Sequence, residues 1–311
     1  MDAIRIENIS RSFGTLRALN RLSLRVERGI LFGFLGPNGS GKTTTIRLLL
    51  GLLDADEGRA EVLGLDTRTQ ADQIRVRCGA LLEHSGLYER LSAAENLDYY
   101  GRIWHMGKAE RESRTRELLE PLELYDRRTE PIGRWSRGMK QKLAVARTLM
   151  HRPELVFLDE PTAGLDPVAS AALREDLEHL AAREGVTVFL TTHNLAEAEK
   201  LCSQVAVISR GQLMAAGSPE DLRSRTSAPR LYITGKIGPQ VVEQLRADPL
   251  VTKLEQHNGR LVLDLTDLSR SHELVTRMVA SGAQIDEVRK EKADLEDVFL
   301  ALVEEEKTGD S

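Results

Sequence analysis

Residues 36–44 read GPNGSGKTT and match the pattern G-x-x-x-x-G-K-[ST]. The stretch follows a predicted strand, ILFGFLG, and opens a predicted helix, which is the context that a phosphate-binding loop requires. Gly36, Gly39 and Gly41 let the backbone turn so that successive amide N–H groups face one point. Because such a row of amides at a helix N-terminus attracts phosphate oxygens, we predict a nucleotide site rather than an ordinary glycine-rich turn.

The other side chains of this loop have distinct expected roles. Lys42 adds a full positive charge at the β- and γ-phosphates, and Thr43 offers its hydroxyl to Mg²⁺. ATP and Mg²⁺ are therefore the expected cofactors. The rest of the loop is also assigned to ATP, namely Pro37, Asn38, Ser40 and Thr44.

A second stretch, LVFLDEP at residues 155–161, supplies the acidic partner. Its apolar residues predict a buried strand, and Asp159 stands at the carboxyl end, where ligands gather in open α/β sheets. We expect Asp159 to hold Mg²⁺, mostly through water. Glu160 is placed to orient or deprotonate a water molecule. The alternative is that Glu160 only caps the turn at Pro161, and the neighbouring P-loop favours the catalytic role.

Two further residues are candidates because of their position. VTVFLTTH ends in His193, at the same predicted sheet edge as Lys42 and Asp159, so we expect a contact with the γ-phosphate, although a lone histidine is usually structural. Phe13 precedes a β-like segment. It either stacks on a base or packs in the core, and its position alone does not decide between the two.

Strand-like and helical patterns alternate over residues 1–217, which predicts an α/β domain with a mainly parallel sheet. Residues 84–152 are helical in pattern and rich in Arg, Glu and Leu, so we expect an inserted helical subdomain there. Residues 218–229 are predicted to be a capped helix and a linker. The order βαββαβ plus a helix over 230–305 predicts a small ferredoxin-like α+β domain, followed by a disordered tail at 306–311.

Composition narrows the function classes. The chain of 311 residues has a formal net charge of −5, which argues against a general nucleic-acid binder, whose domain is usually basic. Only two cysteines occur, so neither a disulfide framework nor a structural zinc site is expected, and a reducing compartment fits. We find no signal-peptide pattern and no apolar run near the ~20 residues that cross a bilayer.

Taken together, these residues resemble the ATP-binding subunit of an ABC transporter. The matching segments follow the order and approximate spacing of that family: Phe13 (A-loop), GPNGSGKTT (Walker A), WSRGMKQ at 135–141 (signature), LVFLDEP (Walker B and its glutamate), AGLD with Asp166 (D-loop) and His193 (H-loop). The resemblance implies a P-loop NTPase ABC ATPase fold, with a RecA-like core, an inserted helical subdomain and an antiparallel β part. It also implies that Lys42, Glu160 and His193 are catalytic and that Asp166 joins the nucleotide-binding set.

The resemblance also gives the WSRGMKQ segment a role. It implies that two copies of the chain pack head to tail and that each presents its signature to ATP held by the other. Ser136 and Gly138 would then bind the γ-phosphate through hydroxyl and amide donors. The commoner form of the segment is LSGGQ, and Trp135, Arg137 and Met139 depart from it. The alternative is that the segment is only a capped basic helix.

A second departure lies at the family's Q-loop glutamine, where this sequence has Glu83. Glutamate keeps an oxygen ligand for Mg²⁺ but loses the N–H donor of glutamine. Our hypothesis is that Glu83 still senses Mg²⁺ and couples the site to the helical subdomain; the alternative is an outward-facing loop residue. The next segment is rich in aromatics, which form either a docking surface for the permease or the packing of the subdomain: Tyr88, Tyr99, Tyr100 and Trp104.

The C-terminal domain, ending in LEDVFLAL, looks like the accessory domain of the daunorubicin-resistance and sodium-export (NatA-like) branch. That branch implies a separate ABC-2-type transmembrane permease as partner and usually export. It also implies a cytoplasmic ATPase held at the inner face of the cell membrane through the permease. The alternative is a soluble ABC ATPase acting on nucleic acid or the ribosome. That class predicts a long heptad insertion, tandem cassettes or a basic surface, and because the sequence has none of these, we expect no nucleic-acid partner.

Overall fold

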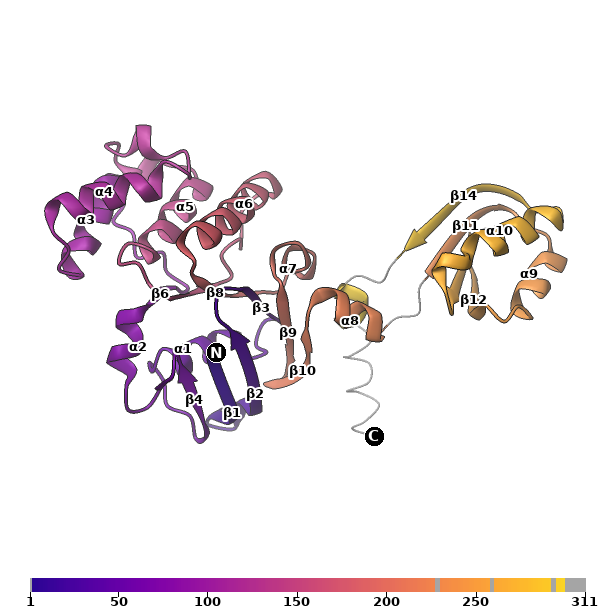
Figure 1. Cartoon of the computed structure of the whole chain (residues 1–311), viewed down its shortest axis with the longest axis horizontal. Helices are drawn as coiled ribbons and strands as arrows, with labels where there is room; N and C mark the ends of the chain where they lie inside the picture. The colour runs from indigo at the N-terminus through magenta and orange to yellow at the C-terminus, as the bar shows by residue number, and fades with distance from the viewer. Residues whose placement is uncertain (1, 227–229, 258–259, 292–294, 300–311) are drawn as a thin grey trace. The chain divides into compact units, whose positions relative to one another are not determined.

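The structure is a computed structural model that describes residues 2–226, 230–257, 260–291 and 295–299. The chain divides into two compact units, Met1–Ser218 and Pro219–Ser311, each with its own hydrophobic core (Figure 1). None of the helices in these ranges combines the length and the hydropathy that a bilayer crossing requires.

A six-stranded sheet forms the centre of the first unit. Its strand order is β10-β9-β3-β8-β7-β6, and all neighbours except the edge strand β10 are parallel. The strands are β3 (Leu31–Leu35), β6 (Cys78–Leu81), β7 (Leu155–Asp159), β8 (Thr187–Thr192), β9 (Gln204–Ser209) and β10 (Gln212–Gly217). Every residue of β7 and β8 is buried, as expected for parallel strands covered on both faces. The parallel sheet predicted from the sequence is confirmed.

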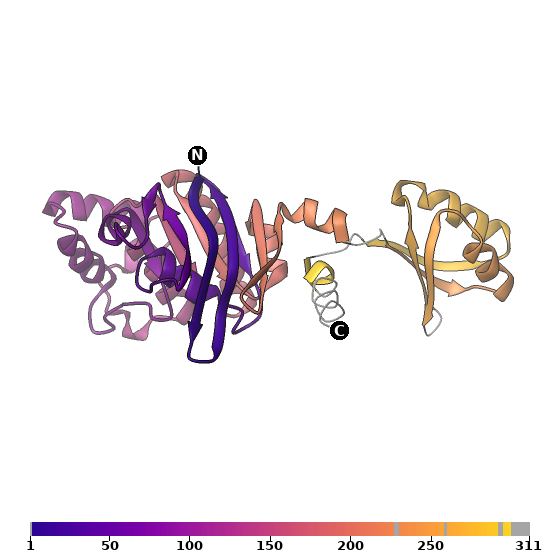
Figure 2. The same cartoon turned by 90° about the horizontal axis from the view of Figure 1, so that it is seen from below.

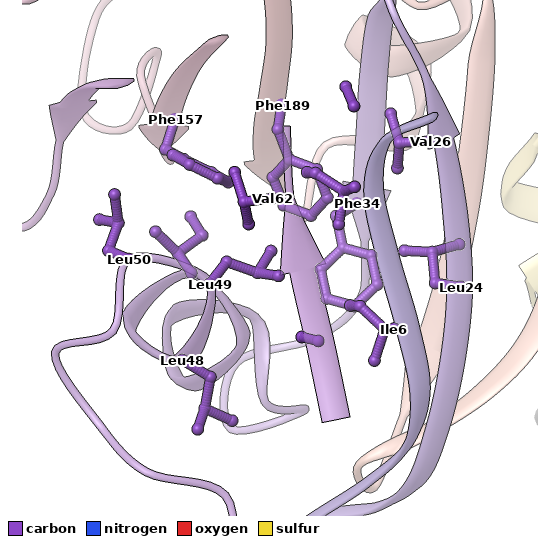
Figure 3. Packing of buried hydrophobic residues seen from close by; sticks show 14 of the residues in the cluster. Ile6, Leu24, Val26, Phe34, Leu48, Leu49, Leu50, Val62, Phe157 and Phe189 are labelled. Atoms are coloured by element: carbon purple, nitrogen blue, oxygen red, sulfur yellow. The ribbon is translucent and has the colours of Figure 1, made fainter. Parts of the chain in front are cut away.

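A second, antiparallel sheet packs against α1 and the central sheet. Its order is β2-β1-β4-β5, with β1 (Asp2–Phe13), β2 (Leu16–Glu27), β4 (Glu57–Val62) and β5 (Leu65–Asp66). Figure 2 shows the long β1–β2 hairpin in full length. Aromatic rings of the central sheet meet aliphatic side chains of the hairpin and of α1 in one core, in which Phe34, Phe189, Ile6 and Leu49 lie together (Figure 3).

Helices cover the rest of the first unit. Four of them flank the sheets: α1 (Lys42–Leu49), α2 (Ala71–Arg77), α6 (Pro167–Glu184) and α7 (Leu195–Leu201). Residues 84–152 hold α3 (Ala93–Ile103), α4 (Lys108–Leu119), η1 (Tyr125–Arg127), η2 (Ile132–Arg134) and α5 (Arg137–Thr148). This range is described throughout, and its only β contact is an isolated bridge between Ser92 and Pro131. In Figure 1, α3, α4 and α5 form a group apart from β1, β2 and β4.

A buried arginine joins this helical group to α6. The side chain of Arg114 in α4 is fully buried, and its guanidinium binds Glu184 at the end of α6 at 2.6 Å. The same group donates to the Leu149 carbonyl at 2.7 Å and to Glu117 at 3.1 Å. A buried charge is stable only where such partners satisfy it, so the cluster fixes α4 and α5 against the C-terminal end of α6.

Both cysteines of the chain lie in the first unit. Cys78 and Cys202 are free thiols and are buried. Burial raises the pKa of each thiol to about 12.

The second unit is a small α+β fold that begins with α8 (Pro219–Thr226). It continues with β11 (Arg230–Lys236), α9 (Pro239–Arg246), β12 (Val251–His257), β13 (Arg260–Leu265), η3 (Leu268–Arg270), α10 (Ser271–Ala280) and β14 (Gln284–Glu291). The sheet is antiparallel with the order β12-β13-β11-β14. This is the βαββαβ order predicted from the sequence, with apolar side chains of α9 and α10 in the core.

Some sequence predictions fall partly outside the described residues. The linker predicted before residue 230 includes residues 227–229, which lie outside the described residues. Residues 295–299 of the final predicted helix are helical, with Leu295 and Val298 buried. The rest of that helix and the tail predicted at 306–311 lie outside the described ranges.

The Arg114 cluster predicts a large effect of one substitution. Arg114→Ala leaves Glu184 without its partner and should lower the free energy of unfolding by about 3–5 kcal/mol. The matched control is Lys108→Ala on the same helix, whose exposed ion pair with Glu112 contributes less than about 1 kcal/mol. Both tryptophans, Trp104 and Trp135, lie within residues 84–152, so urea unfolding followed by tryptophan fluorescence reports on this region. Equal losses in the two variants would contradict the prediction.

Candidate nucleotide site

The site lies where the carboxyl ends of β3, β8 and β7 meet at one edge of the central sheet. The loop after β3 leads into α1, whose second residue is Thr43. The Thr43 hydroxyl donates to the Asp159 carboxylate at the end of β7, with a distance of 2.7 Å. The structure therefore brings together Thr43 and Asp159, two of the three residues that the sequence assigned to Mg²⁺; the recorded partner of the third, Glu83, is Arg47.

The glycines of the loop have the backbone geometry that a phosphate cradle needs. Gly39 and Gly41 have φ angles of 80° and 107°, a region that disfavours other residues. A Cβ atom at Gly36 would lie 2.3 Å from the Ile208 carbonyl oxygen. The buried Ser40 hydroxyl has no hydrogen-bond partner within the part of the chain that the structure describes. An unpaired buried hydroxyl is costly, and a phosphate oxygen is a suitable partner for it.

Lys42 is held inside the loop by its own backbone. Its side chain is only 6% exposed, and Nζ donates to the carbonyls of Gly36 at 2.7 Å and Pro37 at 3.1 Å. The ammonium group also lies 3.2 Å from the Glu160 carboxylate. The loop thus directs the ammonium group of Lys42 toward the sheet edge that carries Asp159 and Glu160.

Glu160 lies between Lys42 and His193. Its second carboxylate oxygen is 2.8 Å from His193 Nδ1, so the structure unites the three residues that the resemblance made catalytic. The backbone of Glu160 has φ 49°, which is strained for a residue other than glycine. Its N–H donates to both the carbonyl and the hydroxyl of Thr191, at 3.1 and 3.0 Å.

Thr191 is a residue that the sequence analysis did not single out. Its buried hydroxyl donates to Asp159 at 2.5 Å, in addition to the contact with Glu160. The available signal was weak: Thr191 is a polar residue near the end of the apolar strand VTVFLTT. The role of Thr191 becomes evident only from the register of β7 and β8, in which Thr191 is the partner of Asp159.

The Thr43–Asp159 pair fits Mg²⁺ by the chemistry of its donors. A hydroxyl and a carboxylate are hard oxygen ligands, and both hydrogen bonds recorded for the Asp159 carboxylate come from hydroxyls rather than from cations. Within the described ranges, no group of three or more His, Cys, Asp or Glu side chains could hold a metal ion by itself. The pair therefore suits a metal that also takes phosphate and water oxygens, as Mg²⁺ commonly does.

The cavity at this loop measures 250 Å³ and is open, which is small for a nucleotide because ligand pockets commonly measure about 300–1,000 Å³. Its lining joins the phosphate loop and Glu160 to the residues around the turn of the β1–β2 hairpin: Phe13, Leu16, Ala18, Asn38, Gly39, Gly41, Lys42, Thr43, Thr44 and Glu160. Phe13 is 46% exposed, with the Arg11 guanidinium 5.0 Å from its ring centroid. An exposed ring at the mouth of the loop is available for stacking on a base, which is the first of the two expected roles.

The signature residues and the D-loop residue do not line this cavity. Ser136 is the N-cap of α5, and its hydroxyl accepts from the Met139 N–H at 3.2 Å. Asp166 is the N-cap of α6 and accepts from the N–H groups of Val168 and Ala169. Both residues lie at the exposed N-termini of helices. We predict that Ser136, Gly138 and Asp166 contact a nucleotide held by a second chain, and this role stays a prediction.

Arg137 ties the signature to the D-loop of the same chain. Its guanidinium donates to the Ala163 carbonyl at 2.9 Å and lies against Gly164, where a Cβ atom would be only 2.4 Å from Nη1. Gln141, one turn further along α5, donates to the Pro161 carbonyl at 2.7 Å. Arg137, one of the three residues that depart from the common LSGGQ pattern, is therefore a link between α5 and the segment that follows Glu160.

Glu83 lies after β6 with an exposed side chain, 3.4 Å from the Arg47 guanidinium of α1. This ion pair connects the Glu83 loop to the helix that begins at the phosphate site. A role of Glu83 as a ligand of Mg²⁺ stays a prediction.

The aromatic segment divides into two pairs. Tyr88 and Tyr99 are 46% and 42% exposed, and their rings meet edge-on with centroids 5.0 Å apart. The half-buried Tyr100 lies under the Arg147 guanidinium and meets Tyr99 edge-on, and the half-buried Trp104 stacks on His151 at 4.0 Å. The first pair is available to a partner, whereas the second packs the helical subdomain.

Comparisons with known proteins found two matching families and many relatives. Residues 19–163 match the ABC transporter family, and residues 217–303 match the C-terminal domain of DrrA1-3-like ATP-binding proteins. The daunorubicin resistance ATP-binding protein DrrA3 of Streptomyces coeruleorubidus is 35% identical over 302 residues, covering 96% of this chain and 95% of that protein. The Nod factor export ATP-binding protein I of Cupriavidus pinatubonensis is 40% identical over 240 residues, covering 77% and 70%.

A solved structure shares the fold. It is an ATP-binding cassette of an ABC transporter in its ADP conformation, with a TM-score of 0.64 and 27% identity. The match covers 71% of this chain and 92% of that structure.

The contact between Arg137 and Gly164 predicts non-additive stability effects. A methyl group at Gly164 displaces the guanidinium, so Gly164→Ala and Arg137→Ala remove the same contact, and the double variant should lose less than the sum by about 0.5–1.5 kcal/mol. Gly29→Ala is the matched control, because Gly29 also has a positive φ but a Cβ atom there meets nothing within 4 Å. Its effect should add to that of Arg137→Ala. Urea unfolding of the four-membered cycle measures the coupling, and strict additivity at Gly164 would refute it.

Proposed function

Because this chain belongs to the ATP-binding proteins of ABC transporters, with a DrrA1-3-like C-terminal domain, we propose that it drives export through a separate ABC-2-type permease. The chain is an ATPase that powers transport. The observation that carries the proposal is the convergence of Lys42, Asp159 and Glu160 at one sheet edge, beside the phosphate loop. The names of the relatives in daunorubicin resistance and Nod factor export support the outward direction.

In this proposal the phosphate loop holds ATP through its backbone amides, and Lys42 neutralises the β- and γ-phosphates. Thr43 and Asp159 hold Mg²⁺, which supplies further charge neutralisation at the phosphates when bound. Glu160 orients the attacking water and takes its proton, and His193, hydrogen-bonded to Glu160, steadies the γ-phosphate. Most of the rate enhancement then comes from positioning and charge, as is usual for phosphoryl transfer.

The proposal needs a second copy of the chain. The cavity at the phosphate loop is open and is lined by one half of the expected ligand set. Ser136, Gly138 and Asp166 of the other copy complete it in a head-to-tail dimer. Ser136 and Gly138 lie at the N-terminus of α5, where free backbone N–H groups and the helix dipole favour a phosphate.

The permease contacts the helical subdomain in this proposal. Tyr88 and Tyr99 supply an exposed aromatic pair a few residues after Glu83, and aromatic side chains with polar tips are enriched at interfaces. The Glu83–Arg47 ion pair then links this surface to α1 and the phosphate site. The chain is accordingly placed at the cytoplasmic face of the cell membrane, held there by the permease.

Replacing the proposed base tests the catalytic assignment. Glu160→Gln keeps the size of the side chain but removes the proton acceptor, so ATP turnover should fall by at least about 100-fold. ATP should still bind, and the ATP-bound dimer should persist long enough to be seen by size-exclusion chromatography with multi-angle light scattering. Glu120→Gln, on the exposed surface of α4, is the control and should behave as the parent. Turnover of Glu160→Gln at the parent's rate would exclude Glu160 as the base.

Alanine substitutions separate docking from packing in the aromatic segment. The double variant Tyr88→Ala/Tyr99→Ala should lose co-purification with the co-expressed permease while it keeps the parent's unfolding midpoint. Trp104→Ala removes the stack of this half-buried ring on His151 and should instead lower the free energy of unfolding by about 1–3 kcal/mol. Val76→Ala, an exposed apolar position on α2, should change neither property. Retained co-purification of the double tyrosine variant would disprove docking at this pair.

A further inference from the structure

We propose that Thr191 is a positioning residue for both acidic groups of the site: it orients the Asp159 carboxylate toward Mg²⁺ and fixes the backbone of Glu160. The inference rests on the proposed nucleotide site and adds a residue to it. Neither the phosphate-loop pattern nor the LVFLDEP stretch contains Thr191, which belongs to the neighbouring strand β8.

The register of the sheet puts Thr191 in place. Strand β8 lies between β3 and β7, and Thr191 is the partner of Asp159 on one side and of Phe34 on the other. Parallel neighbours in register project their side chains to the same face, so the Thr191 hydroxyl and the Asp159 carboxylate meet. Both are buried, with Thr191 fully inaccessible and Asp159 9% exposed.

The Thr191 hydroxyl uses its donor and an acceptor on different partners. It donates to one oxygen of Asp159 at 2.5 Å, while the Thr43 hydroxyl donates to the other oxygen at 2.7 Å. The two hydroxyls hold the carboxylate from opposite oxygens, so its plane is fixed. A ligand held in one orientation by an outer hydrogen bond binds a metal more tightly than a freely rotating one.

The same hydroxyl acts on the next residue. It accepts from the Glu160 N–H at 3.0 Å, and the Thr191 carbonyl accepts from the same N–H at 3.1 Å. The φ angle of Glu160 is 49°, a conformation that persists only when surrounding contacts enforce it. Thr191 supplies two such contacts, and the turn that they hold directs the Glu160 side chain to Lys42 and His193.

A purely structural role of Thr191 would change stability alone, so the test measures how far Mg²⁺ strengthens nucleotide binding. ADP is titrated into the full-length chain by calorimetry, once with EDTA and once with Mg²⁺. The quantity compared between variants is the dissociation constant in EDTA divided by the dissociation constant with Mg²⁺, called the ratio below. Thr191→Val keeps the shape but removes the hydroxyl. It should leave ADP binding in EDTA unchanged and reduce the ratio by about tenfold, the size expected for loss of an outer-shell partner.

Two further variants complete the test. Thr191→Ser keeps the hydroxyl and should retain the parent's ratio. Thr187→Val is the matched control, because Thr187 is a buried threonine on the same strand whose hydroxyl accepts the Gly29 N–H at 2.9 Å, and its ratio should also be that of the parent. If Thr191→Val does not fold, Thr191→Ala against Thr191→Ser provides the same comparison.

The outcomes are distinct. A reduced ratio in the variants without the hydroxyl, with the parent's ratio in Thr191→Ser and Thr187→Val, supports the inference. An unchanged ratio in a folded Thr191→Val or Thr191→Ala overturns it and leaves the proposed function intact. Failure of the parent chain to bind ADP at all would overturn the nucleotide site itself, and the role of Thr191 with it.

Discussion

Thr43 and Asp159 are 116 residues apart in the chain, and a hydrogen bond of 2.7 Å joins them. That contact exists because the β3, β8 and β7 strands run parallel and side by side, so that the loops at their carboxyl ends face one another. Everything else in the first unit either fixes this edge or is attached to it. The aromatic rings of Phe34, Phe157 and Phe189 pack beneath the edge and make it rigid (Figure 3).

The inserted helical subdomain is connected to that edge by polar contacts rather than by a sheet. Arg114 anchors its far side to the C-terminal end of α6, and Arg137 and Gln141 join α5 to the segment after Glu160. These contacts join α5 directly to the backbone of residues 161–163, which follows Glu160. This arrangement gives the signature, which holds no acid or base, a physical connection to the chemistry of its own chain.

The local motifs could be predicted from the sequence, and the contacts between distant segments could not. The glycine spacing of residues 36–44 requires a particular backbone whatever surrounds it, and apolar strands ending in Asp159 or His193 point to the same sheet edge. Thr191 escaped notice because its role depends on strand register, which single-sequence patterns do not encode. Arg137 was noted only as a departure from a consensus, because nothing local indicates that its partner is the backbone at Ala163. The aromatic segment was predicted to serve either docking or packing; Tyr88 and Tyr99 are exposed, and Tyr100 and Trp104 are half-buried.

The two buried thiols have a practical consequence. At neutral pH, groups with pKa values of about 12 hold almost no thiolate, and neither side chain is accessible. A cysteine introduced at an exposed position would therefore be the dominant reactive sulfur of the folded chain, without any native residue having to be removed. Spin labels or fluorophores could then be attached singly to follow the movements of this protein during its cycle.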